Sequence, residues 1–182
     1  MLPFISMVKA QTPDFQKIEF YDVSKKDFVS INDLMGEIGL VLVFSGSHCP
    51  YMNYYEERLN KIKDEYSPLG IEFVLVNSNN SVGEKTETID QMREKSIKSG
   101  YRIISDQSHD VMKSFGAKKN PEVVVLRYKN NQIVKSYKGA IDDNAKSERM
   151  VKDHYLRRVL ANVSVNKPSP VKDTRPAGCL IK

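Results

Sequence analysis

One short stretch limits the choice of fold more than any other: an apolar run followed by a cysteine at which a helical pattern begins. Leu40 to Phe44 is short, rich in β-branched residues and without alternation, which is typical of a strand buried on both faces of a sheet. From Pro50 onward, apolar residues recur at close to a helical period, and proline is favoured in a first helical turn. The sequence therefore predicts a strand-to-helix junction at Cys49.

The position of Cys49 at the start of a helix suggests that its thiol is reactive. A thiol at the start of a helix lies beside unpaired backbone N–H groups and the positive end of the helix dipole, and both favour the thiolate. We therefore interpret Cys49 as a candidate nucleophile. The alternative is a buried core cysteine, which is the commonest role of a lone free cysteine.

The rest of the chain predicts strands and helices in the order β-α-β-α-(α)-β-β-α. Strands are expected at residues 18–21, 28–31, 40–44, 71–76, 103–104, 123–128 and 133–137. Helices are expected at 31–35 with Asn32 as cap, from Pro50, at 88–100, around 111–115 behind a cap at Ser105–Asp106, and at 151–161. The strand, helix and strand between residues 40 and 76 predict a parallel βαβ unit with a right-handed crossover.

The motif around Cys49 also resembles that of a known family. Residues 44–51, FSGSHCPY, resemble the F-x-C-x-H-C-P-[YF] site of redoxins in the alkyl hydroperoxide reductase and thiol-specific antioxidant (AhpC/TSA) group of the thioredoxin superfamily. Further similarities follow in order: TPDF at 12–15, NPEVV at 120–124, YKGAIDD at 137–143 and GCLIK at 178–182. One departure matters, because Gly46 stands where the group has the first cysteine of a C-x-x-C pair.

The resemblance implies an α/β, thioredoxin-like fold: a central mixed sheet flanked by helices, with an N-terminal β extension and a C-terminal tail. Residues 1–11 are then an N-terminal extension, residues 12–161 the redoxin domain, and residues 162–182 the tail that carries Cys179. The resemblance also implies a cis-proline loop facing the redox cysteine, although most X-Pro bonds are trans. Asn120–Pro121 occupies the matching position, and its loop would present backbone groups to an extended substrate segment.

The resemblance assigns further residues to the substrate site. His48 is adjacent to the cysteine and would stabilise a thiolate when protonated. The alternative is a surface histidine that has no catalytic role. Pro50 and Tyr51 complete the motif, and Tyr51 either lines the site or packs. With Asn120 and Pro121 they form the expected substrate-binding set. Asp142 and Asp143 match an acidic pair of the family, and we interpret them as caps of the last helix.

Cys179, the second of two cysteines in the chain, allows three interpretations. It is a resolving partner of Cys49 in place of the residue missing at position 46, a free thiol of the tail, or part of a C-a-a-X lipidation signal. The lipidation signal fits poorly, because lysine is a poor final residue for it. The resembling family carries a similar G-C-x-I-K ending, which explains the motif without lipid.

Composition narrows the classes of partner. The net charge of +5 is spread over interleaved basic and acidic residues, and no nucleic-acid-binding motif is present. Two cysteines and three scattered histidines do not form a local zinc cluster, so we expect no metal and no cofactor. No apolar segment is long enough to span a bilayer. Residues 8–11 resemble a cleavage site, which leaves two expectations: a cytoplasmic protein, or an exported one with a signal-peptide remnant over residues 1–11.

Three functions follow for a chain that we expect to be bacterial. The first is a thiol-disulfide oxidoreductase in which Cys49 is the nucleophile and Cys179 or an external thiol resolves it; its partners would be protein or small-molecule thiols and disulfides. The second is an antioxidant peroxidase, but that site requires a threonine where Gly46 stands and an arginine near Pro121–Glu122. The third is a redox-silent thioredoxin-like module that binds partners over the Pro121 loop.

Overall fold

The computed structural model describes residues 17–79 and 86–182, so predictions for residues 1–16 and for most of the loop after residue 77 lie outside the described residues. The strands are β1 (Glu19–Asp22), β2 (Asp27–Ser30), β3 (Gly39–Phe44), β4 (Ile71–Asn77), β5 (Arg102–Ser105), β6 (Lys119–Asn120), β7 (Glu122–Lys129), β8 (Gln132–Gly139) and β9 (Cys179–Leu180). The helices are α1 (Ile31–Leu34), α2 (Pro50–Tyr66), α3 (Ile89–Ser99), α4 (Asp110–Phe115) and α5 (Tyr155–Val163), with 3-10 turns at Ser67–Leu69 and Glu148–Met150.

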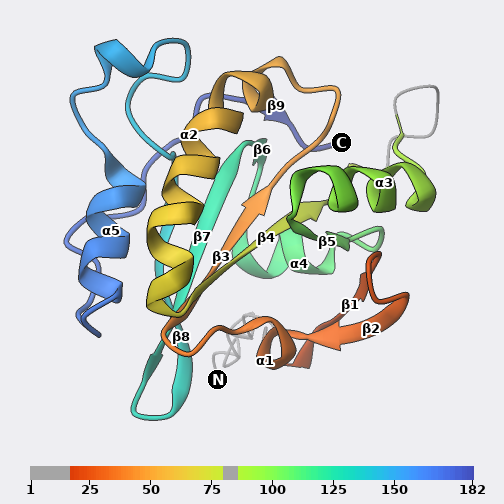
Figure 1. The fold of residues 1–182 in the computed structure, drawn as a ribbon, viewed down its shortest axis with the longest axis horizontal. Coiled ribbons are helices and arrows are strands. Elements are labelled where there is room, and N and C mark those ends of the chain that lie inside the picture. The colour runs from red at the N-terminus through yellow and green to blue at the C-terminus, as the bar shows by residue number, and fades with distance from the viewer. Residues whose placement is uncertain (1–16, 80–85) are drawn as a thin grey trace, which may run out of the picture.

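A mixed sheet in the order β2-β1-β5-β4-β3-β7-β8 forms the centre of the structure (Figure 1). β3, β4 and β5 are parallel to one another, whereas β7 and β8 form an antiparallel hairpin that joins the sheet beside β3. Helix α2 connects β3 to β4, so the predicted βαβ unit is present. The predicted α/β fold, a mixed central sheet flanked by helices, is confirmed.

Both faces of the sheet are covered, which explains the continuous apolar sequence of β3. All six residues of this strand are buried. Val41 and Val43 belong to a core cluster that includes side chains of α2, α3 and α5. Leu40, Leu42 and Phe44 face the other way, into a cluster with α1 and α4. A strand placed between two cores has no solvent face, and therefore its sequence needs no polar alternation.

One predicted helix cap and one predicted helix start are wrong. Ser30, not Asn32, caps α1, because Ser30 has extended backbone and its N–H donates to the Asp33 carboxylate over 2.8 Å. The last helix begins at Tyr155 and not at residue 151. The backbone N–H of Lys152 donates to the Asp143 carboxylate over 2.9 Å, which holds this segment outside the helix.

The predicted capping role of the acidic pair is also wrong. Asp142 is buried and binds groups of α2, and Asp143 binds a loop N–H, so neither carboxylate caps α5. Two other caps agree with the sequence. Thr88 and Gln91 form the expected capping box of α3, and the Asp106 carboxylate accepts N–H groups in the first turn of α4.

The C-terminal tail runs beside β8 and ends beside β6. Asp173 accepts the backbone N–H of Lys138 over 2.8 Å, and the N–H of Thr174 donates to the Lys138 carbonyl over 3.1 Å. The Thr174 hydroxyl lies 2.6 Å from that of Tyr137. Beyond this segment the tail crosses to β6, near the N-terminal end of α2, where it forms β9 (Figure 1).

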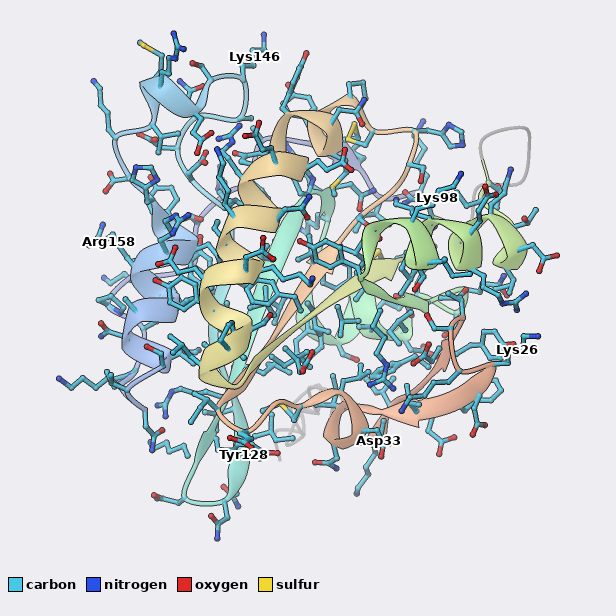
Figure 2. All side chains as sticks on the ribbon, viewed as in Figure 1. Lys26, Asp33, Lys98, Tyr128, Lys146 and Arg158 are labelled. Carbon is cyan, nitrogen blue, oxygen red and sulfur yellow. A yellow bond between two sulfur atoms is a disulfide. The ribbon has the colours of Figure 1, made fainter. Side chains whose placement is uncertain are left out.

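Charged side chains are distributed over the surface. Figure 2 shows Lys26, Lys98, Lys146 and Arg158 on four separate parts of the molecule, which agrees with the interleaved charges of the sequence. Among the described residues, no helix has the length and apolarity needed to cross a membrane.

Candidate active site

Cys49 lies at the predicted junction, one residue before the first turn of α2. It is the N-cap of this helix, with extended backbone angles, and Pro50 occupies the first helical turn. The N–H of Cys49 donates to the Gly46 carbonyl over 3.0 Å, which closes a tight turn between β3 and α2. The side chain is buried, with 4% of its surface exposed. Its sulfur is therefore held at the positive end of the helix dipole and away from bulk solvent.

Cys179 is the disulfide partner of Cys49. The two Cα atoms are 5.9 Å apart, within the usual range for a disulfide, across a sequence separation of 130 residues. The antiparallel pairing of β9 with β6 places Cys179 opposite Asn120. Cys179 is thus a partner of Cys49 and not a free thiol of the tail.

The loop at Asn120 and Pro121 faces this disulfide. The peptide bond between these two residues is cis. The carbonyl oxygen of Asn120 lies 3.0 Å from Sγ of Cys49. An oxygen at this distance can accept the S–H of a reduced Cys49, but it repels a thiolate, so it opposes the effect of the helix terminus.

Asparagine side chains occupy the space beside Gly46, where the family motif has its first cysteine. A Cβ atom at position 46 would lie 3.1 Å from Cγ of Asn79 and closer still to the amide nitrogen. Asn120 donates from its side-chain amide to the side-chain oxygen of Asn79 over 3.0 Å. The absent cysteine therefore leaves no hole, because these amides fill its place.

A carboxylate that the sequence did not reveal fixes the loop before Cys49. Glu87 accepts the backbone N–H of Ser47 over 3.2 Å and also accepts the Ser47 hydroxyl. It accepts the amide of Asn77 over 2.6 Å and lies 4.0 Å from the ammonium of Lys95, which donates to the Ser47 hydroxyl over 2.8 Å. Glu87 positions the loop without touching the sulfur. Nothing in the sequence around Glu87 distinguishes it from a surface residue.

The other predicted site residues are not all brought together. His48 is exposed and lines the recess beside the disulfide, together with Asn120. Pro50 is exposed in the first turn of α2 and lies outside that lining. Tyr51 packs against the core and meets Tyr54 edge-to-face at 6.0 Å. Across the described parts of the chain, no group of three or more histidine, cysteine, aspartate or glutamate residues is placed to hold a metal ion.

A buried ion pair anchors the helix that carries the site. Arg58 of α2 donates to the Asp142 carboxylate over 2.6 Å, and their side chains are 7% and 3% exposed. The same guanidinium donates to the carbonyl of Asn144 over 2.9 Å. The hydroxyl of Tyr55 donates to the other oxygen of Asp142 over 2.9 Å. Burial, together with the Asp142 charge, raises the pKa of Tyr55, so its hydroxyl remains a donor.

The fold and the disulfide at the start of α2 define a thioredoxin-like redoxin. Residues 8–142 match the AhpC/TSA family, and the chain belongs to that family. A search of curated proteins gives no match.

Comparison with solved structures supports this assignment of the fold. An uncharacterized conserved protein from Geobacillus kaustophilus is similar over 91% of this chain and 87% of its own, with a TM-score of 0.79 and 23% identity. A hypothetical protein from Sinorhizobium meliloti 1021 is similar over 91% and 90%, with a TM-score of 0.76 and 23% identity. A thioredoxin-like protein from Aeropyrum pernix is similar over 65% and 79%, with a TM-score of 0.51 and 14% identity.

Proposed function

We propose that the protein is a thiol-disulfide oxidoreductase in which Cys49 is the nucleophile and Cys179 is the resolving thiol. The observation that carries this proposal is the disulfide between the chain's two cysteines, one at a helix N-terminus and one on a tail strand. A helix N-terminus favours the thiolate that attacks a disulfide. The tail places the second sulfur where it can complete the exchange.

The proposed cycle consists of two thiol-disulfide exchange reactions. The Cys49 thiolate attacks one sulfur of a substrate disulfide, forms a mixed disulfide, and releases the other substrate sulfur as a thiolate. The Cys179 thiolate then attacks Sγ of Cys49, and the remaining substrate thiolate leaves. The substrate has gained two electrons and the protein holds the Cys49–Cys179 disulfide, which an external dithiol of protein or small-molecule class reduces again.

A peroxidase function has weaker support. Gly46 has no hydroxyl to offer a peroxide, and Asn79 fills the space beside it. Glu122 stands where peroxiredoxins use an arginine, and its buried carboxylate accepts the N–H groups of Lys118 and Lys119 over 2.7 and 3.2 Å. This carboxylate orders the β6 segment, and its negative charge cannot replace a guanidinium.

Reaction of the reduced protein with oxidised glutathione tests the proposed cycle. Wild type should form the intramolecular disulfide, whereas Cys179→Ser should accumulate a mixed disulfide at Cys49, because the second exchange is blocked. Cys49→Ser is the matched control and should react slowly, as an exposed model thiol does. Intact mass and peptide mapping separate these products. If Cys49→Ser reacts as fast as Cys179→Ser, Cys49 is not the nucleophile; if neither reacts, the redox-silent binding module is the better assignment.

A further inference from the structure

The tail binds the redox site in the way that a separate extended peptide would. β9 adds to β6 as an antiparallel strand, with Leu180 opposite Lys119 and Cys179 opposite Asn120. The N–H of Ile181 also donates to the Lys118 carbonyl over 3.0 Å. These are main-chain contacts, and main-chain contacts of an added strand are independent of side-chain identity. Side chains must therefore decide which segment is accepted.

The tail side chains alternate along this strand. Cys179 points toward Cys49, and Leu180 is 63% exposed. Ile181 is partly buried against the core cluster that includes α1 and α4. This alternation is the period of a strand, so the side chains at the first and third positions of the Cys-Leu-Ile segment face the protein, whereas that of Leu180 is mostly exposed at the rim of the recess.

The residue before the cysteine meets the backbone of the proline loop. A Cβ atom at Gly178 would lie 2.8 Å from the carbonyl carbon of Asn120 and even closer to its oxygen. Backbone atoms cannot rotate away as the end of a side chain can. Any larger residue at this position would push the strand off β6, and with it the following cysteine sulfur.

Resting on the proposed function, we propose that the edge of β6 selects disulfide-bearing segments of the form Gly-Cys-X-aliphatic. Tail residues 178–181 are its resident occupant in the oxidised protein. After reduction, a partner segment whose cysteine is half of a disulfide displaces the tail. The Cys49 thiolate attacks that sulfur and the other sulfur of the partner disulfide leaves as a thiolate. The tail then returns to β6, and Cys179 attacks Sγ of Cys49 and releases the segment as a thiolate. The Asn120 carbonyl is the element that selects glycine, and the core beside Ile181 selects the aliphatic residue.

Activated peptides test this selection on the full chain. The protein is Cys179→Ser, so that the tail cannot form the internal disulfide. The probe is Ala-Gly-Cys-Leu-Ile-Lys, the sequence of residues 177–182, with its cysteine as a 2-pyridyl disulfide. Attack by Cys49 joins peptide and protein through a new S–S bond and releases pyridine-2-thione, whose absorbance gives the rate. Three further peptides replace Gly by Ala, Leu by Asp or Ile by Asp, and each rate is divided by the rate of the same peptide with free glutathione.

We expect the Gly-to-Ala peptide to react about tenfold more slowly, the penalty of forcing one methyl group against packed atoms. The Ile-to-Asp peptide should also be slow, while Leu-to-Asp, at the exposed position, should match the parent. Equal rates for all four peptides overturn the proposal. Dipyridyl disulfide does not depend on binding along β6, so it separates the peptide selection from the proposed function. If it reacts with Cys49 but the four peptides react at equal rates, only the proposed selection fails. If it does not react with Cys49, the proposed function fails too.

A second variant tests whether the tail occupies the edge of β6. Adding Gly178→Ala to Cys179→Ser introduces the same clash into the resident segment and should loosen it. The parent peptide should then react faster than with Cys179→Ser alone, while the rate with dipyridyl disulfide changes less. A parent-peptide rate that does not rise in a variant with wild-type circular dichroism shows that the tail does not compete for this site.

Discussion

Loss of the Asp142 charge should destabilise the protein strongly, because it leaves the Arg58 guanidinium buried without its counter-ion. In Asp142→Asn the side chain keeps its shape, but the ion pair at 2.6 Å between groups only 7% and 3% exposed is lost. Removing one partner of a buried ion pair costs about 3–5 kcal/mol. At roughly 2–4 °C per kcal/mol for a chain of this size, the melting temperature should fall by about 6–20 °C.

Asp143→Asn is the matched control for this experiment. Asp143 is the adjacent residue, is exposed, and accepts a backbone N–H of Lys152 over 2.9 Å. Its replacement should cost much less than that of Asp142, because the carboxylate is exposed to solvent and the asparagine oxygen can still accept the Lys152 N–H. Unfolding of the oxidised proteins in guanidinium chloride measures the loss in the free energy of unfolding for both variants. An unchanged dependence of this free energy on denaturant concentration shows that the surface exposed on unfolding is the same. Equal losses for the two variants would refute the reasoning, because burial of the Arg58 charge would then carry no penalty.

Three further predictions concern the thiol and a buried acid. In Cys179→Ser, the pKa of Cys49 should lie below that of a free cysteine, because we expect the helix terminus to outweigh the opposing Asn120 carbonyl. Alkylation rates against pH measure this pKa, and an ordinary or higher value contradicts the nucleophile assignment. Stopped-flow mixing with hydrogen peroxide should show slow oxidation of Cys49, since Gly46 and Glu122 supply neither hydroxyl nor guanidinium; peroxiredoxin-like speed would favour the peroxidase. Burial raises the pKa of Asp106 above 3.8, only partly offset by its hydrogen bonds, so the folded state holds this proton more tightly than the unfolded chain. The contribution of Asp106 to stability should therefore fall as pH rises from 3.8 through its folded-state pKa. The difference in denaturant midpoint between wild type and Asp106→Asn should change by this amount over that pH range.

Local patterns were sufficient to predict the strand-to-helix junction and the order of elements. The apolar run of β3, the proline after Cys49 and the Thr88 capping box each act within a few residues, so they are visible in the sequence. The hairpin between β7 and β8 turns at Asn130 and Asn131, which both have positive φ angles that asparagine tolerates.

The remaining features depend on contacts between distant segments. Glu87 meets Ser47 across 40 positions, and Asn120 meets Asn79 across 41, with no local pattern to mark either pair. Asp142 looked like a helix cap because aspartate before a helix is ordinary; its role is set by Arg58, 84 positions away. β9 has two residues, too few to show a period.

The amides beside Gly46 affect how a second local cysteine could be acquired. Gly46→Cys alone would bring a Cβ atom into the Asn79 side chain and disturb the amide pair with Asn120. A smaller residue at position 79 would first have to open the space, at the cost of a hydrogen bond to the loop that faces Cys49. The order of substitutions therefore matters: the route from this one-cysteine motif to a C-x-x-C pair passes through Asn79, and each new thiol at position 46 would compete with Cys179 for the same sulfur.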